Sequence, residues 1–510
     1  MTERRKFFIN GGLLTAVGLL MRSSQLLFGA YISRRVGAEG IGLHTLIMTV
    51  FAFAVTFATS GVSLTVTRLV ASAIGEGNED GGKIVKGAML YAGIFGSVAT
   101  IALMFLAGVL GDVVLGGQGS ASSLRILALS LLPSAFSAVI SGYFVGVRKS
   151  AYNAAVQVIG QVFRSVITVL LLMMIGGGTA DAVRMLCIGA TVTELLCFAV
   201  SLAEFIIERC IKRKREGGIT VRPVAQMALP LAISAYIRSA LLTLEHNLIP
   251  KRLMKRGQVR EEALSSYGTL HGMALPLILY PMAPLSSFCS LLVPEFAEDL
   301  AGGRKKRMER IAQEALGVTL SYSVACAVLI AFHAEDLGYV IYDSFDAGAY
   351  IGMLSLVIPI MYLDHVTDSI LKGIGEHVFS MWINIADAFL SVGLVFVLIP
   401  VFGIGGYAIV IVGMELFNFI LSYARLKRRI SFRLPIFKRA VIPAVSSVLA
   451  SLLTDVLFVS GGKAGGVPIL LMKLSFSLAA LFVIWVPLSR FVSMIFEKTE
   501  NHNNCLRENK

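Results

Sequence analysis

The fold class is decided by residues 379–424, which read FSMWINIADAFLSVGLVFVLIPVFGIGGYAIVIVGMELFNFILSYA. Within this stretch only Asp387 and Glu415 carry a charge. An α-helix needs about 20 apolar residues to cross the ~30 Å hydrocarbon core of a bilayer, and two such segments fit here, 379–400 and 404–424. The connection between them is so short that the two helices must be antiparallel neighbours in a membrane.

The composition of the whole chain points the same way. Of its 510 residues, 56% are hydrophobic and 15% are charged, with a mean hydropathy of +0.78. A soluble globular protein carries roughly 25% charged residues. The six cysteines form no CxxC pair, so neither a disulfide framework nor a zinc site is expected, and no metal cofactor is predicted.

Apolar stretches of spanning length recur along the sequence. We therefore predict an all-α polytopic membrane protein of about fourteen transmembrane helices. The spans are expected near 11–33, 42–66, 84–111, 124–147, 153–175, 182–208, 224–250, 266–294, 311–332, 350–371, 379–400, 404–424, 440–459 and 468–496.

The distribution of Lys and Arg predicts the orientation, because cytoplasmic loops are enriched in these residues. With the N-terminus inside, the inner loops are basic, whereas 112–123, 333–349 and 401–403 contain no Lys or Arg. Both termini are therefore expected in the cytoplasm. One loop breaks the rule: 251–262, KRLMKRGQVREE, is basic but falls outside. Either one span is miscounted or this loop is an amphipathic element on the outer face; we favour the second because every later loop obeys the rule.

The net charge of +13 is then mainly a signal of topology, and no nucleic-acid partner is expected. The basic loops alternate with apolar spans, which is the pattern of a multi-pass protein of the cytoplasmic membrane.

The two halves of the chain resemble each other at a shift of about 226 positions. Leu132-Pro133 and Gly146 match Ile358-Pro359 and Gly373, and Gly42 matches Gly268. A parallel repeat of this kind often places the substrate between the two copies and works by alternating access. The repeat predicts an N-lobe of six helices (1–208), a basic linker (209–223), a C-lobe of six helices (224–424), a basic loop (425–439), two further helices (440–496) and a cytoplasmic tail (497–510).

Arg22 lies in the middle of the first span, and Arg238 is its counterpart in the seventh. An Arg at lipid depth costs roughly 2.5–3.5 kcal/mol or more, so it normally faces the bundle interior or a wet cavity. Two guanidinium groups facing one cavity would suit a pyrophosphate, which they bind in a bidentate fork. The structural alternative is an ion pair with a buried carboxylate. Glu245, two turns after Arg238, is the candidate partner and is itself also a candidate substrate ligand.

Other polar side chains in the spans are candidates for the cavity lining or for coupling to Na⁺ or H⁺. His271 is the candidate substrate ligand in the eighth span, and Arg68, at the inner end of the second, is expected to be a gate or anchor. Buried carboxylates can bind Na⁺ or relay protons, but a group near a helix end can equally be hydrogen-bonded or snorkel to the interface. The carboxylates considered for coupling are Asp364, Asp368, Asp387 and Glu415. Three histidines are also candidates for the cavity lining, His44 in the second span, His246 in the seventh and His365 in the tenth, and Arg164 and Glu194 are as well explained as structural partners as they are as site residues.

Three stretches carry a family resemblance. They are RRVGAEGIGLHTL (34–46) followed by TSGVSLTVTRLVASAIGEGN (59–78), ALSLLPSAFSAVISGYFVGVRKSAYNAAVQVIGQVFR (128–164), and the connection from Asn247 to Pro281. They resemble the stage V sporulation protein B group of the MATE-like exporter superfamily, which also contains polysaccharide flippases and MurJ-type lipid II flippases.

The resemblance implies a two-lobed helical bundle that flips an undecaprenyl-pyrophosphate-linked sugar, here a peptidoglycan precursor or a related oligosaccharide in spore cortex or cell-wall synthesis. The expected partners are this lipid-linked glycan, membrane lipids and cell-wall synthesis proteins. MurJ-type flippases use cavity arginines, one of them in the first helix, where Arg22 stands. The arginines of their eighth helix have no match here, since His271 is the only basic residue in 266–294 and the segment contains no Lys or Arg.

An enzyme is not expected. The sequence contains no GxxxxGK[ST], HExxH or GxSxG motif, and no outer loop is long enough to form a catalytic domain. The alternative function is a cation-coupled antiporter of drugs or organic cations, of the MATE type, which would centre on an intramembrane carboxylate rather than on Arg22.

Overall fold

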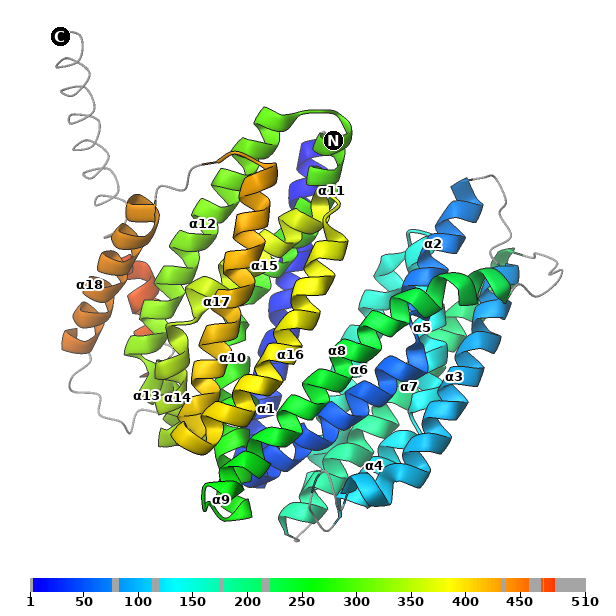
Figure 1. Cartoon of the computed structure of the whole chain (residues 1–510), viewed down its shortest axis with the longest axis horizontal. Coiled ribbons are helices and arrows are strands. Elements are labelled where there is room, and N and C mark those ends of the chain that lie inside the picture. The colour runs from blue at the N-terminus through cyan, green and yellow to red at the C-terminus, as the bar shows by residue number, and fades with distance from the viewer. Residues whose placement is uncertain are drawn as a thin grey trace. The chain divides into compact units, whose positions relative to one another are not determined.

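A computed structural model describes residues 3–75, 82–111, 115, 119–174, 178–212, 221–432, 436–457, 469–470 and 472–481. Within these ranges the regular secondary structure is helical and no strand occurs (Figure 1). The predicted all-α class is confirmed.

The helices follow one another closely along the chain. In the first half they are α1 (Glu3–Thr59), α2 (Val62–Gly75), α3 (Gly82–Val109), α4 (Ser120–Ala128), α5 (Leu131–Gly146), α6 (Ser150–Met173) and α7 (Thr179–Lys212). In the second half they are α8 (Arg222–Lys255), α9 (Arg260–Tyr267), the π-helix η2 (Gly268–Ala274), α10 (Leu275–Leu279), the 3₁₀ turn η3 (Tyr280–Met282), α11 (Ala283–Ala301), α12 (Lys305–Phe332), α13 (Ala334–Tyr342), α14 (Phe345–Ser355), α15 (Ile358–Gly373), α16 (His377–Phe402), α17 (Ile404–Arg429), the π-helix η4 (Phe437–Val441) and α18 (Ile442–Leu457).

Nine helices of the described chain are long and apolar enough to cross a membrane, or up to twelve if each bent helix pair is one span. The helix α1 covers two predicted spans, because its 57 residues would extend about 86 Å. Gly37 interrupts it with a φ of 78°, a left-handed conformation that glycine adopts without steric cost. Of the last predicted span, 468–496, only residues 469–470 and 472–481 lie within the described residues. The predicted tail, 497–510, lies entirely outside them.

Three spans are sharply bent, and each bend lies at or near a proline. The pairs α4–α5 and α14–α15 bend by 41° and 56°, just before Pro133 and Pro359. The helix α8 bends by 41° after Pro230. Proline has no N–H to donate and its ring clashes with the preceding turn, so a helix is weakened where it occurs.

The sequence repeat reappears in the helices. The helices α3 and α12 both have 28 residues, and α5 and α15 both have 16 residues and both follow a bend. Contacts also repeat: Gly146 packs on Thr67 and Val70, as Gly373 packs on Val293 and Phe296. The repeated segments therefore fold alike, and not merely into helices of similar length.

Contacts divide the chain into two units. Unit 1 comprises Met1–Arg34, Thr269–Ile383 and Ala408–Lys510, and unit 2 comprises Arg35–Gly268 and Asn384–Tyr407. Each unit combines segments from both sequence halves. The lobes 1–208 and 224–424 follow the repeat rather than these contacts, and that division stays a prediction.

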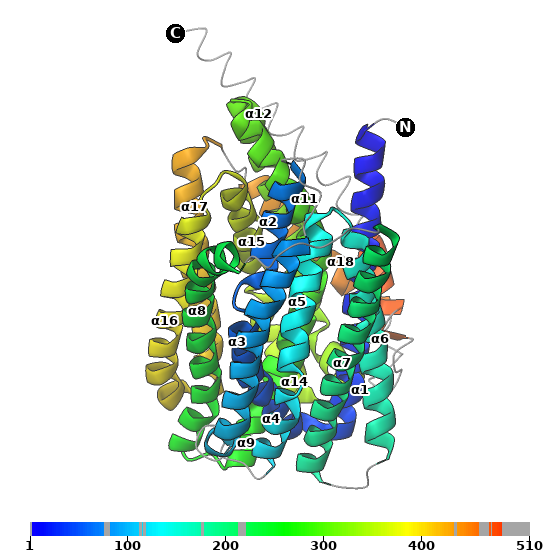
Figure 2. The same cartoon turned by 90° about the vertical axis from the view of Figure 1, so that its right-hand side faces the viewer.

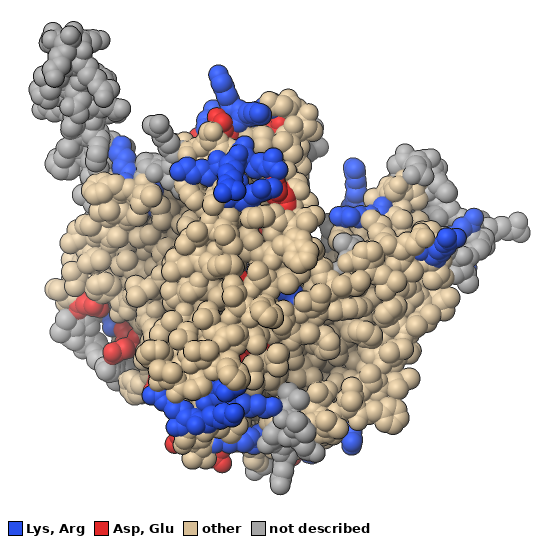
Figure 3. All heavy atoms as spheres, in the orientation of Figure 1, with Lys and Arg blue, Asp and Glu red and all other residues tan. Residues whose placement is uncertain are grey.

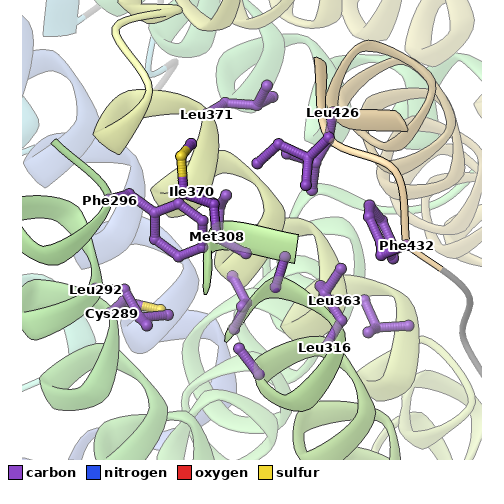
Figure 4. Close-up of a cluster of buried hydrophobic side chains, with 14 of the residues drawn as sticks. Cys289, Leu292, Phe296, Met308, Leu316, Leu363, Ile370, Leu371, Leu426 and Phe432 are labelled. Carbon is purple, nitrogen blue, oxygen red and sulfur yellow. The ribbon is translucent and has the colours of Figure 1, made fainter. Parts of the chain in front are cut away.

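The core of unit 1 is formed where α11, α12, α15 and α17 pack together (Figure 4). Phe296, Met308, Ile370 and Leu426 come from these four helices and are buried. Figure 2 shows the helices α3, α5, α6 and α7 of unit 2 running alongside one another. On the face seen in Figure 3, Lys and Arg gather near helix ends and the area between them is almost uncharged.

Candidate functional site

The end of α10 and the turn η3 that follows it, in unit 1, offer backbone carbonyls to side chains. Pro281 and Pro284 cannot donate to the carbonyls of Leu277 and Tyr280, and the helix tightens into η3, which contains Pro281. The carbonyl of Ile278 accepts a hydrogen bond from Tyr362 (2.8 Å), and that of Pro281 accepts one from Tyr322 (2.7 Å). The carbonyl between them, that of Leu279, accepts one from the Nη1 of Arg22.

We call the side chains that surround this stretch the Arg22 cluster: Arg22, Ser23, Tyr280, Tyr322 and Tyr362. The hydroxyl of Ser23 hydrogen-bonds to that of Tyr280 (2.9 Å), so α1 makes two consecutive contacts with the broken helix. The rings of Tyr322 and Tyr362 stack with their centroids 6.3 Å apart. The cluster thus draws on four elements, α1, η3, α12 and α15, and Arg22 is half-buried within it.

The charge of Arg22 is not cancelled by a carboxylate: no ion pair within the described part of the chain involves it. Its contact is with a neutral carbonyl, and a guanidinium carries five N–H donors in a planar fork. A cation held in this way keeps donors with which to bind an anionic group.

Arg238 lies exposed on α8 in unit 2. The structural alternative, an ion pair between Arg238 and Glu245, is not found among the described residues. Glu245 is buried and its carboxylate accepts a hydrogen bond from Ser391 (2.6 Å). Because Arg22 belongs to unit 1, the idea that both arginines face one cavity stays a prediction.

Glu245 belongs to a buried polar group in unit 2 that we call the Glu245 cluster: Glu245, His246, Tyr267, Asp387 and Ser391. Asp387 and Ser391 are one turn apart on α16, so they share a face, and Asp387 is a like-charge neighbour of Glu245. Nδ1 of His246 and the hydroxyl of Tyr267 lie 3.0 Å apart. The structure thus brings together two carboxylates that the sequence singled out separately.

Two carboxylates and a hydroxyl at lipid depth can bind a monovalent cation or exchange a proton. Within the described residues no group of three or more His, Cys, Asp and Glu side chains is arranged to hold a metal ion. Coupling to Na⁺ or H⁺ stays a prediction.

The remaining candidates are dispersed over both units. In unit 1, Asp368 forms an ion pair with Lys372 (2.6 Å), which makes it less suited to cation binding. Arg164 and Glu194, in unit 2, pair at 3.2 Å, in agreement with the structural reading of both. The structure places the other candidates without showing a role for them. His271 on η2, Asp364 on α15, Glu415 on α17 and His44 on α1 are half-buried, and Arg68 on α2 is exposed.

Sequence reasoning missed the hydroxyl groups of both clusters, those of Ser23, Tyr280, Tyr322, Tyr362 and Ser391. One signal was available: Pro281 and Pro284, three residues apart, predict a distorted stretch of helix, in which backbone carbonyls can turn to side-chain donors. Nothing in the sequence indicates which tyrosines supply those donors, because they come from spans far away along the chain.

A multi-pass bundle with bent spans and charged side chains within them is typical of membrane transporters and flippases, and the solved structures that share the fold are a flippase and a transporter rather than enzymes. Residues 8–298 match the family described as Polysaccharide biosynthesis protein, and residues 257–397 match MatE. The first match covers more than half of the chain, which therefore belongs to the polysaccharide biosynthesis protein family.

Two proteins of Bacillus subtilis (strain 168) are similar to the chain. Stage V sporulation protein B is 25% identical over 425 residues, 81% of this chain and 82% of that protein. Sporulation protein YkvU is 18% identical over 354 residues, 68% of this chain and 78% of that protein. The resemblance stated from the sequence is confirmed.

Solved structures share the fold. The lipid II flippase MurJ, in an inward closed conformation, has a TM-score of 0.73 at 14% identity and covers 94% of this chain and 99% of its own. An inward-facing multidrug resistance MATE family transporter of the MOP superfamily has a TM-score of 0.64 at 16% identity and covers 82% of this chain and 98% of its own. The chain thus has the fold of the MOP superfamily.

Proposed function

We propose that the protein flips an undecaprenyl-pyrophosphate-linked sugar across the cytoplasmic membrane by alternating access. The substrate is lipid II or a related oligosaccharide carrier, used in cell-wall or spore-cortex synthesis. The observation that carries the proposal is the half-buried Arg22, which is hydrogen-bonded to the carbonyl of Leu279 and, among the residues that the structure describes, not to a carboxylate.

The charge of the substrate matches this site. A pyrophosphate offers several anionic oxygens, and a guanidinium binds such oxygens more strongly than a neutral carbonyl because both partners are charged. Arg22 would exchange the carbonyl of Leu279 for the pyrophosphate, and Arg238 would supply a second cation. The prenyl chain would stay in the lipid.

The Glu245 cluster supports coupling to Na⁺ or H⁺. Glu245 and Asp387 repel each other when both are ionised at lipid depth, and a bound cation or proton relieves that repulsion. His271, Asp364, Asp368 and Glu415 would line the pathway, with Arg68 as an anchor at its inner end. Both termini would lie in the cytoplasm, as the Lys and Arg distribution predicts.

A reconstituted flip assay tests the proposal. Proteoliposomes carrying a fluorescent undecaprenyl-pyrophosphate-linked disaccharide are treated with a membrane-impermeant quencher, and the rate at which labelled lipid changes leaflet is measured. We expect Arg22→Ala to slow this rate about 10–100-fold, since a charged hydrogen bond to phosphate is worth about 1.5–3 kcal/mol.

Ser24→Ala, on the same helix, is the matched control, and Arg22→Lys should be intermediate because an ammonium cannot form the bidentate fork. Equal flipping by the wild type and Arg22→Ala would refute the proposal.

The second candidate function is a cation-coupled antiporter of organic cations, and the observation that favours it is the Glu245 cluster. In that case Glu245→Gln would abolish efflux of a fluorescent cationic dye from vesicles under an ion gradient, whereas Arg22→Ala would leave it intact. Loss of activity is thus expected in Arg22→Ala if the protein is a flippase and in Glu245→Gln if it is an antiporter.

A further inference from the structure

Two arginines at equivalent positions of the repeat donate hydrogen bonds to backbone carbonyls. Arg34, near the end of the first span, donates from Nε to the carbonyl of Ile341 (3.2 Å) and from Nη2 to that of Val340. Arg260, at the start of α9, donates from Nη2 to the carbonyl of Leu115 (3.2 Å). The donors are 226 residues apart, and so are the acceptors Leu115 and Ile341.

Each contact lies inside one unit and joins the two sequence halves. In unit 1, Arg34 of the first half holds α13 of the second half. In unit 2, Arg260 of the second half holds the connection after α3 of the first half. The two contacts are thus reciprocal, each half supplying one arginine and one acceptor.

The acceptor carbonyls need these donors. At the end of α13, the N–H groups of Asp343 and Ser344 bond back to Tyr339 and Gly338, so the later carbonyls of Val340 and Ile341 have no such cap. A cation at a helix C-terminus is also favoured by the helix dipole. Leu115 is buried, and a buried carbonyl without a donor is costly.

The acceptor segments are built alike as well. A Cβ built on Gly111 would lie 2.8 Å from the backbone nitrogen of Ala121, and one on Gly338 would overlap that of Gly348; both residues of the second pair are 227 positions further along the chain. The arginines themselves each stand eight residues before a matched glycine, Gly42 or Gly268. The paired contacts therefore belong to the repeat and are not accidents of surface packing.

We propose that Arg34 and Arg260 are paired latches, each of which holds the predicted outer end of its own unit closed by joining segments of the two sequence halves, and that the two release together when the protein opens to that side. By the order of the spans, all four contacting segments fall on that side. Arg34 is exposed, so water can replace the carbonyls when the latch opens. The inference deepens the proposed function and rests on its alternating access.

Two buried serines beside the latches serve as reporters. Ser33 is adjacent to Arg34, and Ser120 lies in the segment that follows Leu115. In full-length protein with the native cysteines replaced, Ser33→Cys or Ser120→Cys is reacted with a membrane-impermeant maleimide in nanodiscs without substrate. The rate of labelling measures how often the outer end opens.

We expect Arg34→Ala and Arg260→Ala each to raise the labelling rate of both reporters about ten-fold, which corresponds to about 1.4 kcal/mol for the lost charged hydrogen bond. Arg35→Ala and Lys255→Ala remove an exposed cation from the same segments and serve as charge-matched controls. Arg34→Lys should be intermediate, because an ammonium lacks the planar fork that spans two carbonyls.

Labelling no faster than in the two controls would overturn the latch, and so would a response confined to the nearer reporter, which indicates local fraying. Because no substrate is present, the outcomes separate cleanly. Faster labelling in a protein that flips no lipid-linked sugar would refute the proposed function and keep the latch, whereas normal flipping with unchanged labelling would do the reverse.

Discussion

Gly42 and Gly268 pack backbone against backbone at equivalent positions of the repeat. A Cβ on Gly42 would overlap the carbonyl of Leu264, and a Cβ on Gly268 would overlap that of Ala38. In each case the overlapped carbonyl lies four residues before the other glycine. The contact is reciprocal, like an isologous contact across a twofold axis, although it is formed within one chain.

This crossing predicts that neither glycine tolerates a side chain. Gly42→Ala and Gly268→Ala should each destabilise the protein by about 1–3 kcal/mol, because overlap with a backbone carbonyl cannot be relieved by rotating a side chain. Thermal unfolding in detergent should show midpoints lowered by several degrees. Gly29→Ala in the same helix meets no atom within 4 Å and is the control. Equal midpoints for all three variants would show that the two backbones are not in contact.

The Glu245 cluster predicts an ion-dependent stability. If Na⁺ binds between Glu245 and Asp387, replacing choline chloride by NaCl at equal ionic strength should raise the unfolding midpoint of the wild type, since a ligand stabilises the state that binds it. Glu245→Gln, which keeps an oxygen for Ser391, should abolish that increase. The ion-paired Asp368, as Asp368→Asn, should retain it. A midpoint indifferent to Na⁺ but sensitive to pH would assign the cluster to protons.

The ion pairs around the turn between α11 and α12 are expected to stabilise the folded protein. The side chain of Asp299 is buried and accepts from Arg304 Nε (2.7 Å) and Arg307 Nη1 (3.0 Å). Asp299→Ala should cost about 1.5–3 kcal/mol, the range for hydrogen bonds to a charged group. Glu298→Ala removes an exposed partner of Arg304 and should cost less than about 1 kcal/mol. Similar midpoints for the two variants would contradict the burial of Asp299.

Glu376, in the connection between α15 and α16, predicts a dependence on acid pH. Hydrogen bonds from Arg425 foremost, and from Arg429, hold the pKa of this carboxyl below its usual range. The unfolded chain therefore takes up the proton first. The stabilisation is complete above a pH of about 5, beyond the ordinary Glu pKa, and is lost as the pH falls through the lower folded value. Unfolding midpoints of the wild type and Glu376→Gln should differ at neutral pH and converge below about pH 4. A constant difference over this range would exclude the effect.

Several features of the fold could be predicted from local sequence. The apolar stretches gave the class and the order of the spans, and the matched Gly42 and Gly268 gave the repeat before their contact was known. The bends at Pro133, Pro230 and Pro359 follow from a ring that removes one donor, which is a property of the residue itself.

The candidate site was only partly predictable. Arg22, Glu245 and Asp387 stand out in the sequence because a charge in an apolar span is costly wherever it lies. The pairing of Glu245 with Arg238, considered from their spacing on one helix, is replaced by a hydrogen bond from Ser391, 146 residues away. Spacing on a helix identifies a shared face but not what packs against it.

The sequence by itself thus determined that this is a duplicated bundle of membrane spans, since burial in lipid depends on each segment's own hydrophobicity. Only the tertiary structure decided that Arg22 binds a carbonyl 257 residues away and that Arg34 and Arg260 exchange acceptors between the halves. Hydrogen-bond partners at such separations are fixed by the packing of helices, which brings freed backbone groups within about 3 Å of a donor that no local pattern identifies.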